Sequence, residues 1–170
     1  MVASLCLVPK GFALETTTFT TDEGAVLNIS LSSVGNTATV TGLGDESFRG
    51  VLNIPTEIAY DGSSYSVVTI GDEAFRNGRM TAVSLGNVTT VGASAFRNCS
   101  SIQSLDLSNV KIIGDYAFYM KGSALKSLVF SGNLQSVGNQ AFSNSVTTVT
   151  VNVDNLMQIN GLPIPTLNPL

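Results

Sequence analysis

The sequence contains no histidine and no tryptophan, and charged residues make up only 12% of its 170 residues. Without histidine the chain cannot form a Ser-His-Asp or Cys-His nucleophile arrangement or a His-ligated metal site. Its two cysteines, Cys6 and Cys99, are too few for a disulfide framework. We therefore expect a protein that is not an enzyme and that holds no cofactor and no metal.

Strong positive charge and long hydrophobic runs are also missing. The net charge is −4, so the chain lacks both the basic surface of a nucleic-acid-binding protein and a polybasic membrane signal. The apolar run Val2–Val8 is too short for a transmembrane span, which needs about 20 residues. Because 44% of the residues are hydrophobic, we expect a folded domain whose polar surface comes from serine, threonine and asparagine. Such a surface suits an extracellular β-rich protein.

A short motif recurs through the second half of the chain. It combines a glycine with an alanine-phenylalanine pair, as in Ile70-Gly71-Asp72-Glu73-Ala74-Phe75. Successive copies lie 21, 22 and 24 residues apart, and self-similarity on this scale is typical of solenoid proteins. The glycines are Gly71, Gly92, Gly114 and Gly138, and the phenylalanines are Phe75, Phe96, Phe118 and Phe142.

A second pattern follows each copy of the motif. Met80-x-x-Val83-x-Leu85 matches the L-x-x-L-x-L strand of a leucine-rich repeat, and the pattern returns from Ile102, from Leu125 and from Val146. Each repeat should therefore add one short strand to a parallel sheet, with the leucine-type positions pointing inward. The residues expected to face outward form the candidate partner-binding face: Ala82, Ser84, Ser104, Asp106, Ser127, Val129, Thr148 and Thr150.

The remainder of each repeat should return on the convex side through a short helical turn. Each glycine provides a turn without a Cβ penalty, and a short polar side chain after it can cap the helical turn. We expect the alanines to stack where backbones approach closely and the phenylalanines to form a buried ladder. The capping residues are Asp72, Asp115 and Asn139, and the alanines are Ala74, Ala95, Ala117 and Ala141.

Residues 15–66 are predicted to form a β-hairpin cap that covers the apolar end of the first repeat. One hairpin is indicated by alternating apolar residues at 27–31 and 37–41 around a Gly-Asn turn. A second is indicated around Asp61-Gly62, because this dipeptide permits the positive φ angles of a tight turn. Four leucine-rich repeats should then occupy residues 67–154.

Gly44-Asp45-Glu46-Ser47-Phe48 echoes the repeat motif upstream of the first full repeat. The leucine-type positions that should follow it are poorly matched. We therefore interpret it as a loop of the cap, with a degenerate repeat as the alternative.

The two ends of the chain are harder to interpret. Residues 1–14 resemble the remnant of a signal peptide with cleavage before Leu14, although an ordinary apolar N-terminal strand is the alternative. Residues 155–170 are apolar and interrupted by prolines. They could cover the last repeat, begin a further truncated repeat, or form an apolar end that self-associates.

With these motifs the chain resembles the BspA-like leucine-rich repeat family. Ile70-Gly71-Asp72-Glu73-Ala74-Phe75 followed by an L-x-x-L-x-L strand is typical of it, and Asn98-Cys99 after Ala95-Phe96 fits its pattern. Residues 54–62 resemble the segment that often leads into such repeats. The resemblance implies a bacterial surface or secreted protein used for adhesion or other protein binding. Gly78, Lys121 and Ser145 replace Cys99 in the other repeats, which loosens the match.

Several chemical interpretations are weaker than structural ones. The neighbouring acids Asp45-Glu46 and Asp72-Glu73 should diverge, so they do not form a general acid/base pair. A calcium site along the polar column after the glycines would need 6–8 oxygens, and Ala93 interrupts that column. Cys99 is interpreted as a buried small residue rather than a reactive thiol.

Three arginines, Arg76, Arg79 and Arg97, should cluster on the convex side with Tyr119 next along. Such a cluster could hold an anionic partner. Because Glu73 and its neighbouring acid lie close enough to neutralise much of the charge, we interpret the cluster as an ordinary solvated surface.

The outward face of the sheet is small and poor in the Trp, Tyr and Arg residues that dominate interfaces. Its area is on the order of 200 Å², against about 800 Å² per partner in a standard interface. Either the cap contributes to the contact, or the contact is weak and multivalent, or the chain is one piece of a longer array. We predict a non-enzymatic binding or adhesion module for host extracellular or neighbouring-cell proteins, located extracellularly or at the cell surface, with multivalency supplying avidity. A structural spacer repeat in a larger surface assembly is the alternative.

Overall fold

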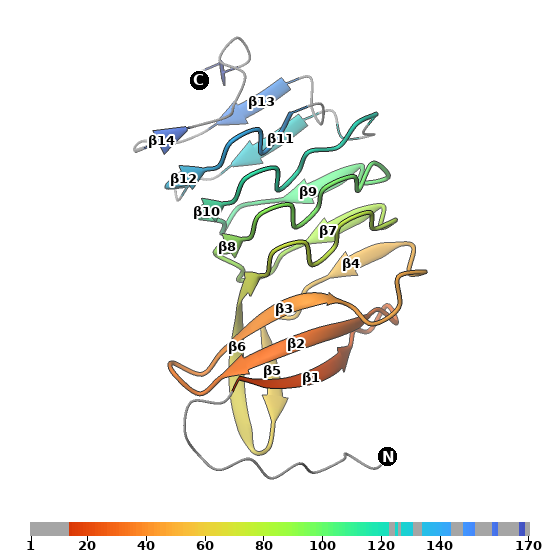
Figure 1. The fold of residues 1–170 in the computed structure, drawn as a ribbon, viewed down its shortest axis with the longest axis vertical. Coiled ribbons are helices and arrows are strands. Elements are labelled where there is room, and N and C mark those ends of the chain that lie inside the picture. Colours follow the sequence, from red (N-terminus) through yellow and green to blue (C-terminus); the bar gives the residue numbers. More distant parts are fainter. Residues whose placement is uncertain are drawn as a thin grey trace.

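In the computed structural model the described residues are 14–122, 125, 127–130, 134–143, 148–151, 158–159 and 167–168. Throughout these residues the regular structure consists of strands and turns, and none of it is helical. The described part of the chain accordingly contains no helix that could cross a membrane. The chain rises from an N-terminal group of longer strands into a stack of short strands (Figure 1). The predicted signal-peptide remnant at residues 1–13 lies outside the described residues.

The first three strands form an antiparallel sheet: β1 (Glu15–Thr20), β2 (Val26–Ser32) and β3 (Thr37–Leu43). The predicted hairpin is confirmed by the pairing of β2 with β3. Leu27, Ile29 and Leu31 are buried on one face of β2, and their neighbours are only half-buried, as alternation predicts. β1 was not anticipated, because Glu15–Thr20 carries a single large apolar residue.

The second hairpin is also confirmed. β5 (Glu57–Tyr60) pairs antiparallel with β6 (Ser63–Ile70), and the turn residues Asp61 and Gly62 have φ values of 47° and 73°. Two positive φ angles in succession are characteristic of the type I′ turn that fits the twist of a hairpin. The far half of β6 leaves the hairpin and pairs parallel with β3 and then with β8 (Thr90–Val91). β6 therefore converts the antiparallel sheet into a parallel one.

Each later repeat contributes one short strand to each of two rows. One row continues the long sheet in the order β6, β8, β10, β12, β14, and its later members are β10 (Ile112–Ile113), β12 (Ser136–Val137) and β14 (Gln158–Ile159). The other row lies on the opposite side of the stack (Figure 1). It comprises β4 (Val51–Asn53), β7 (Ala82–Ser84), β9 (Ser104–Asp106), β11 (Ser127–Phe130), β13 (Thr148–Val151) and β15 (Leu167–Asn168).

The second row is divided into two parallel sheets, β4-β7-β9 and β11-β13-β15. β4 pairs in register with β7, so Leu52 lies beside Val83 and Asn53 beside Ser84. The row therefore begins before the first full repeat, in a segment that the sequence assigned to the cap. β14 and β15 extend the two rows within residues 155–170; the other residues of that segment lie outside the described part. The choice among its three interpretations stays a prediction.

The prediction that each repeat returns through a short helical turn is wrong. The third residue of the repeat motif has a positive φ in every copy: 57° at Glu73, 56° at Ser94, 56° at Tyr116 and 52° at Gln140. A left-handed residue cannot continue a right-handed helical turn. The backbone N–H groups instead donate to the next repeat, as Glu73 does to Ala93 and Phe75 to Ala95, at 2.9 and 2.8 Å. The N–H groups between these donate within the turn, as Arg76 does to Glu73 and Gly78 to Phe75, at 3.0 and 2.9 Å. The turns therefore bond both within themselves and to the next repeat.

The prediction that the polar residue after each glycine caps a helical turn is wrong for the same reason. The carboxylate of Asp72 accepts a hydrogen bond from the backbone N–H of Ala93 at 2.7 Å, and that of Asp115 accepts one from Asn139 at 2.7 Å. These side chains reach across to the next repeat and do not cap a helix. Each links two repeats at the exposed side of the stack.

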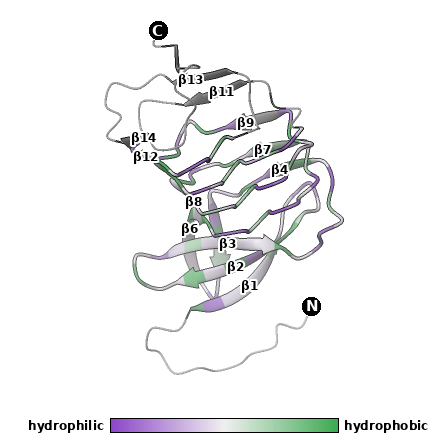
Figure 2. Cartoon of the chain, turned by 45° about the horizontal axis from the view of Figure 1, so that its top comes forward, coloured by the Kyte–Doolittle hydropathy of each residue, from purple (hydrophilic) through white to green (hydrophobic). Residues whose placement is uncertain are grey.

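The phenylalanine ladder is confirmed. Phe75, Phe96, Phe118 and Phe142 are at most 1% exposed, and adjacent rings stack with centroid distances of 5.1, 5.2 and 5.2 Å. Ala95, Ala117 and Ala141 are completely buried beside them, as their small size in the motif predicted. Hydrophobic and hydrophilic residues alternate along the coloured levels of the stack, so these levels supply both core and surface (Figure 2).

Candidate functional site

The outward face of β4, β7 and β9 carries a shallow hollow of about 360 Å³. Two rows of residues cross it because the three strands pair in register. Asn53, Ser84 and Asp106 form a polar row, and Val51 and Ala82 begin a small apolar row. Val51 is 46% exposed and Ala82 is half-buried, so a patch of apolar surface is accessible there. Val83 and Leu105 complete the lining.

The structure brings Ser84 and Asp106 together as the sequence predicted, since the two residues are register partners. Ser104 lies in the same sheet, where it is the register partner of Ala82. The carboxylate of Asp106 accepts a hydrogen bond from the N–H of Ser108 at 2.9 Å, so part of its hydrogen-bonding capacity is used within its own turn. The face therefore offers mainly small, neutral groups to a partner.

The remaining predicted residues of the face lie on the separate sheet of β11 and β13. Ser127 pairs with Thr148, and Val129 pairs with Thr150, in the parallel register that the repeat predicts. Only their backbone positions are described. Because β9 and β11 belong to different hydrogen-bonded sheets, the predicted face is not one continuous sheet.

Two lining residues, Val51 and Asn53, were missed by the sequence analysis. The signal was present, because Leu52-Asn53-Ile54 has the same apolar-polar-apolar order as Val83-Ser84-Leu85. The preceding segment diverges from the repeat, and for this reason the strand was assigned to the cap. Pairing of β4 with β7 shows that the face includes it.

The acidic residues that the sequence singled out have local structural contacts. Hydrogen bonds from the Ser47 side chain and from the Ser47 N–H, the latter at 2.8 Å, lower the pKa of the Asp45 carboxyl. Asp72 and Asp115 are each occupied with a backbone N–H of the next repeat. Among the described residues no cluster of three or more Cys, Asp or Glu side chains is arranged to hold a metal ion.

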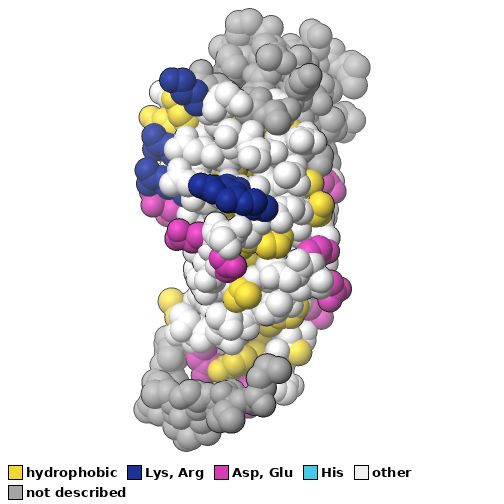
Figure 3. Space-filling model, turned by 90° about the vertical axis from the view of Figure 1, so that its right-hand side faces the viewer, with side chains coloured by type: hydrophobic (Ala, Val, Ile, Leu, Met, Phe, Trp, Pro, Cys, Tyr) yellow, Lys and Arg dark blue, Asp and Glu magenta, His cyan; other side chains and the backbone are white. Residues whose placement is uncertain are grey.

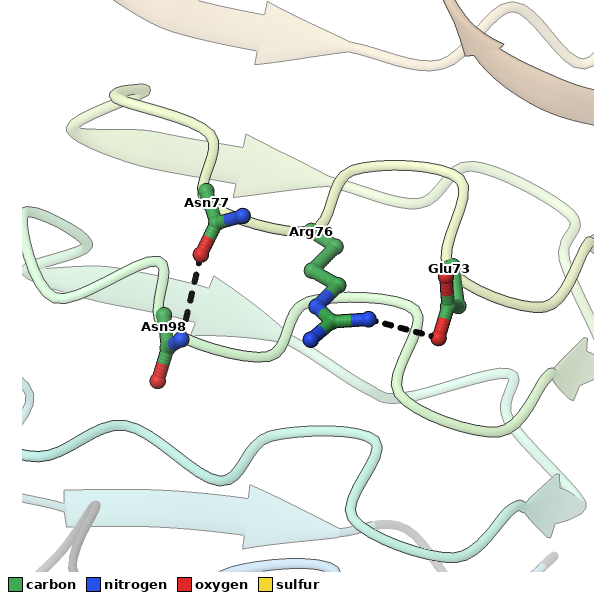
Figure 4. A network of polar contacts seen from close by, with 4 residues as sticks. All are labelled: Glu73, Arg76, Asn77 and Asn98. Carbon is green, nitrogen blue, oxygen red and sulfur yellow. Dashed lines mark hydrogen bonds and ion pairs between the residues drawn. The ribbon is translucent and has the colours of Figure 1, made fainter.

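The predicted arginine cluster lies on the turns that carry the Gly-Asp-Glu-Ala-Phe motif. Arg76 donates to the carboxylate of Glu73 at 2.8 Å, both side chains being well exposed. On the next repeat Asn98 donates to the side-chain oxygen of Asn77 at 3.0 Å. Figure 4 shows these four side chains projecting from two adjacent turns. Arg97 lies over the rings of Tyr116 and Tyr119, at 5.5 and 5.4 Å from their centroids.

Cys99 is buried, as predicted. Its thiol donates a hydrogen bond to the carbonyl oxygen of Phe75 at 2.9 Å, and burial raises its pKa to about 12. A thiol with so high a pKa is protonated at neutral pH and is a poor nucleophile. Cys99 therefore acts as a packing residue that links two repeats.

Comparison with known families identifies the chain. The family described as BspA type Leucine rich repeat region matches residues 56–161 with six copies. The stacked short strands and the motif described above agree with this match. The chain belongs to the BspA-type leucine-rich repeat family. No curated protein matches it.

Solved structures of leucine-rich repeat proteins are similar to this chain. One from Bacteroides capillosus is 28% identical, with a TM-score of 0.66, over 79% of this chain and 97% of that protein. One from Bacteroides ovatus is 27% identical, with a TM-score of 0.61, over 94% and 43% of the two chains. A leucine rich cell surface protein from Faecalibacterium prausnitzii is 25% identical, with a TM-score of 0.57, over 84% and 44%. This chain thus spans less than half of the latter two proteins.

Proposed function

We propose that this chain is a non-enzymatic protein-binding module, secreted or exposed on the cell surface, built as a short solenoid. The observation that carries the proposal is the hollow on β4, β7 and β9, where the polar row from Asn53 to Asp106 borders the exposed Val51. An apolar spot with polar residues around it follows the general layout of protein interfaces, which have an apolar core and a polar rim. Surface location is supported by the relative from Faecalibacterium prausnitzii, which is described as a cell surface protein.

The size of this face favours weak contacts. Three strands spaced about 4.8 Å apart give a patch of a few hundred Å² at most, well below the roughly 800 Å² that each partner contributes to a standard interface. Strong attachment then depends on several copies acting together. The partners proposed are host extracellular or neighbouring-cell proteins. Self-association through residues 155–170 remains a further proposal.

The face can be tested by filling the hollow. Replacing Ala82 or Ser84 by arginine puts a long charged side chain into the hollow, while Ser33→Arg makes the same kind of change on an exposed turn between β2 and β3. All three proteins should be displayed on beads as multimers and applied to immobilised extracellular-matrix proteins. We expect Ala82→Arg and Ser84→Arg to abolish retention and Ser33→Arg to leave it unchanged. No retention of the unmodified multimer on any matrix protein would count decisively against the proposal.

A structural spacer in a larger surface assembly is the second candidate. It is favoured by the way successive repeats are joined, through two rows of strands, the phenylalanine ladder and the Asp72 and Asp115 links. Such uniform connections suit a rigid extension. Specific binding of the monomeric chain to one soluble partner, lost in Ser84→Arg, would argue against a pure spacer.

A further inference from the structure

A second hollow lies between the N-terminal sheet and the turn of the first repeat. Its volume is about 660 Å³, and it opens between the end of β3 with the loop after it and residues 73–79. Its charged lining consists of Arg49, Arg76, Arg79, Glu46 and Glu73. Arg76 is paired with Glu73, whereas no ion-pair partner of Arg49 or Arg79 is found among the described residues. Two exposed arginines thus face this hollow against one unpaired glutamate.

The basic surface continues from this hollow onto the next repeat. Arg76 and Arg97 occupy the same position of successive repeats, and the N–H of Asn77 donates to the carbonyl of Arg97 at 2.8 Å. Adjacent backbones joined in this way lie about 4.8 Å apart. Lysine and arginine side chains gather along one edge of the molecule, with acidic side chains beside them (Figure 3). Among the described lysines and arginines, Arg49, Arg76, Arg79 and Arg97 line this hollow or lie on these turns, whereas Lys111 and Lys121 do neither.

The packing of Arg97 is a second observation that points to an anionic ligand. The guanidinium of Arg97 lies within 5.5 Å of the ring centroids of Tyr116 and Tyr119, and the two rings are themselves packed edge to face. Its Nε atom is buried and has no hydrogen-bond partner among the described residues. An arginine held by aromatic rings, with no carboxylate partner among the described residues, is positioned in advance. Because its Nε is buried, the donors that it can offer are those of its two terminal amino groups. Such a group suits an anion that can take two hydrogen bonds at once.

We propose that this edge, from Arg49 and Arg79 across Arg76 to Arg97, binds an acidic polysaccharide through its carboxylate or sulfate groups. The site is separate from the sheet face, and the proposal does not depend on it. Successive guanidiniums along the stack match a linear chain that carries one anionic group every few ångströms. The hydroxyl and amide groups of Thr41, Ser47 and Asn77, which also line the hollow, can bond to sugar hydroxyls.

A polysaccharide fits this edge better than a protein does. The exposed large hydrophobic residues of the described chain are Leu14, Val34, Val51 and Ile112, and none of them lies on these turns. A protein partner would find no exposed aliphatic side chain on these turns to bury, and the half-buried Tyr116 and Tyr119 already pack against Arg97. A hydrophilic polyanion needs charge, hydrogen bonds and ring faces, and the tyrosines at Arg97 supply the last of these.

The test uses the full chain and two probes, heparin, which carries sulfate and carboxylate groups, and polygalacturonate, which carries carboxylates alone. Neutral dextran is the reference. We expect binding to at least one acidic polymer at low ionic strength, with affinity falling as salt shortens the Debye length to about 8 Å at 0.15 M. Heparin binding alone assigns the site to sulfate, and binding of both assigns it to carboxylate as well.

Four variants locate the site. Arg49→Gln combined with Arg79→Gln should lower the affinity on the order of tenfold, because charge-assisted hydrogen bonds are lost. Arg97→Lys keeps the charge but loses the planar donors, and it should weaken binding several-fold. Glu73→Gln should strengthen binding, because Arg76 is released from its carboxylate partner. Lys111→Gln removes a charge from an exposed residue away from this edge and should have no effect beyond a slight uniform loss.

Thermal unfolding shows that the variants remain folded before binding is measured. Three results overturn the proposal. They are equal retention of dextran and the acidic polymers, a loss in Lys111→Gln as large as that in the arginine double variant, and tighter binding of polyglutamate than of either polysaccharide. The last result would assign the edge to acidic peptides.

Discussion

The carboxylate of Asp72 accepts a hydrogen bond from the backbone N–H of Ala93, its counterpart one repeat later, at 2.7 Å. The same relationship joins Asp115 to Asn139, also at 2.7 Å. Between these two links the chain has Ala93, which has no side-chain oxygen to offer Asp115. The exposed side of the stack is therefore linked at two junctions out of three in this series.

Ala93→Asn is expected to complete the series. An asparagine occupies the equivalent position at 139, and its side-chain oxygen at position 93 can accept the N–H of Asp115. A net intramolecular hydrogen bond contributes about 0.5–1.5 kcal/mol, so we predict a rise in unfolding free energy of that size in urea titration.

Two further variants act as controls for Ala93→Asn. Asp72→Ala should lower stability by a similar amount, because the N–H of Ala93 loses its acceptor. Ala93→Asp should stabilise less than Ala93→Asn at low salt, since it stacks a third carboxylate between Asp72 and Asp115. If the Ala93→Asn protein were no more stable than the parent, this hydrogen bond would make no net contribution to the free energy of unfolding.

The repeat glycines are needed for a reason that differs from the predicted one. Gly92, Gly114 and Gly138 do not have positive φ angles; they lie against the backbone of the preceding repeat. A Cβ at Gly114 would lie 2.6 Å from the nitrogen of Ala93 and 2.8 Å from the carbonyl carbon of Gly92. At Gly71 the nearest atom to such a Cβ is the carbonyl oxygen of Val40, at 3.3 Å, and atoms of Thr39 and Thr41 follow at 3.6 and 3.8 Å, because β3 rather than a repeat lies beneath it.

This difference predicts unequal costs for the same substitution at two copies of one motif. Gly114→Ala should destabilise the protein by about 2–3 kcal/mol, the upper range for overpacking, because both obstructing atoms belong to the backbone. Gly71→Ala should cost less than about 1 kcal/mol. Chemical denaturation of the two variants gives the comparison directly. Equal losses would show that turn conformation, and not approach between repeats, sets the requirement for glycine.

The parts of the fold that could be predicted are those encoded by local periodicity. The phenylalanine ladder and the strands β7, β9, β11 and β13 follow from apolar spacing within about twenty residues, which indicates which side chains must be buried together. The second strand of each repeat, in β8, β10 and β12, was not predicted. The Asp61-Gly62 turn was predictable because two residues determine it. The family resemblance rested on the same motif and is confirmed by the matched region.

The parts that could not be predicted depend on contacts between repeats. The positive φ of Glu73 is imposed by a hydrogen bond to the next repeat, and no local propensity of glutamate indicates it. β4 belongs to the sheet face because it pairs with β7, and each residue of β4 lies beside the residue 31 positions later in the chain. The residues of the predicted face and the domain boundaries remain predictions, since their role needs a partner to test it. The packing of Arg97 on Tyr116 was missed because only the three-dimensional stack brings them together.

Phe96 is, with Phe118, one of the two ladder positions where a ring stacks on both sides and truncation should cost most. Its ring stacks between Phe75 and Phe118, with centroid distances of 5.1 and 5.2 Å, and it is completely buried. Phe96→Ala should lower the unfolding free energy by about 3–5 kcal/mol, through lost burial and the cavity it leaves. Phe96→Leu retains most of the volume and should cost appreciably less. A loss below 1 kcal/mol in Phe96→Ala would show that adjacent repeats collapse into the space.

Cys99 makes stability depend on pH above the neutral range. The thiol ionises near its ordinary pKa of 9.0 in the unfolded chain, whereas burial raises the pKa in the folded chain to about 12. Between these values the unfolded state binds fewer protons than the folded state, so stability falls as pH rises. The slope approaches about 1.4 kcal/mol per pH unit. The full contribution is present below pH 9 and is lost progressively toward pH 12.

The comparison that isolates this effect is Cys99→Ser, in which the hydroxyl can still donate to Phe75 but does not ionise. Its stability should change less than that of the parent between pH 8.5 and pH 10.5, values chosen to lie on either side of the ordinary pKa. In a Cys6→Ser background, Cys99 should also react with iodoacetamide at pH 8 only after denaturation, because the native thiol is buried and protonated. Two results would contradict a Cys99 thiol that is buried and hydrogen-bonded to Phe75. They are parallel pH–stability curves for the two proteins, and alkylation of the native protein at the rate of a free thiol.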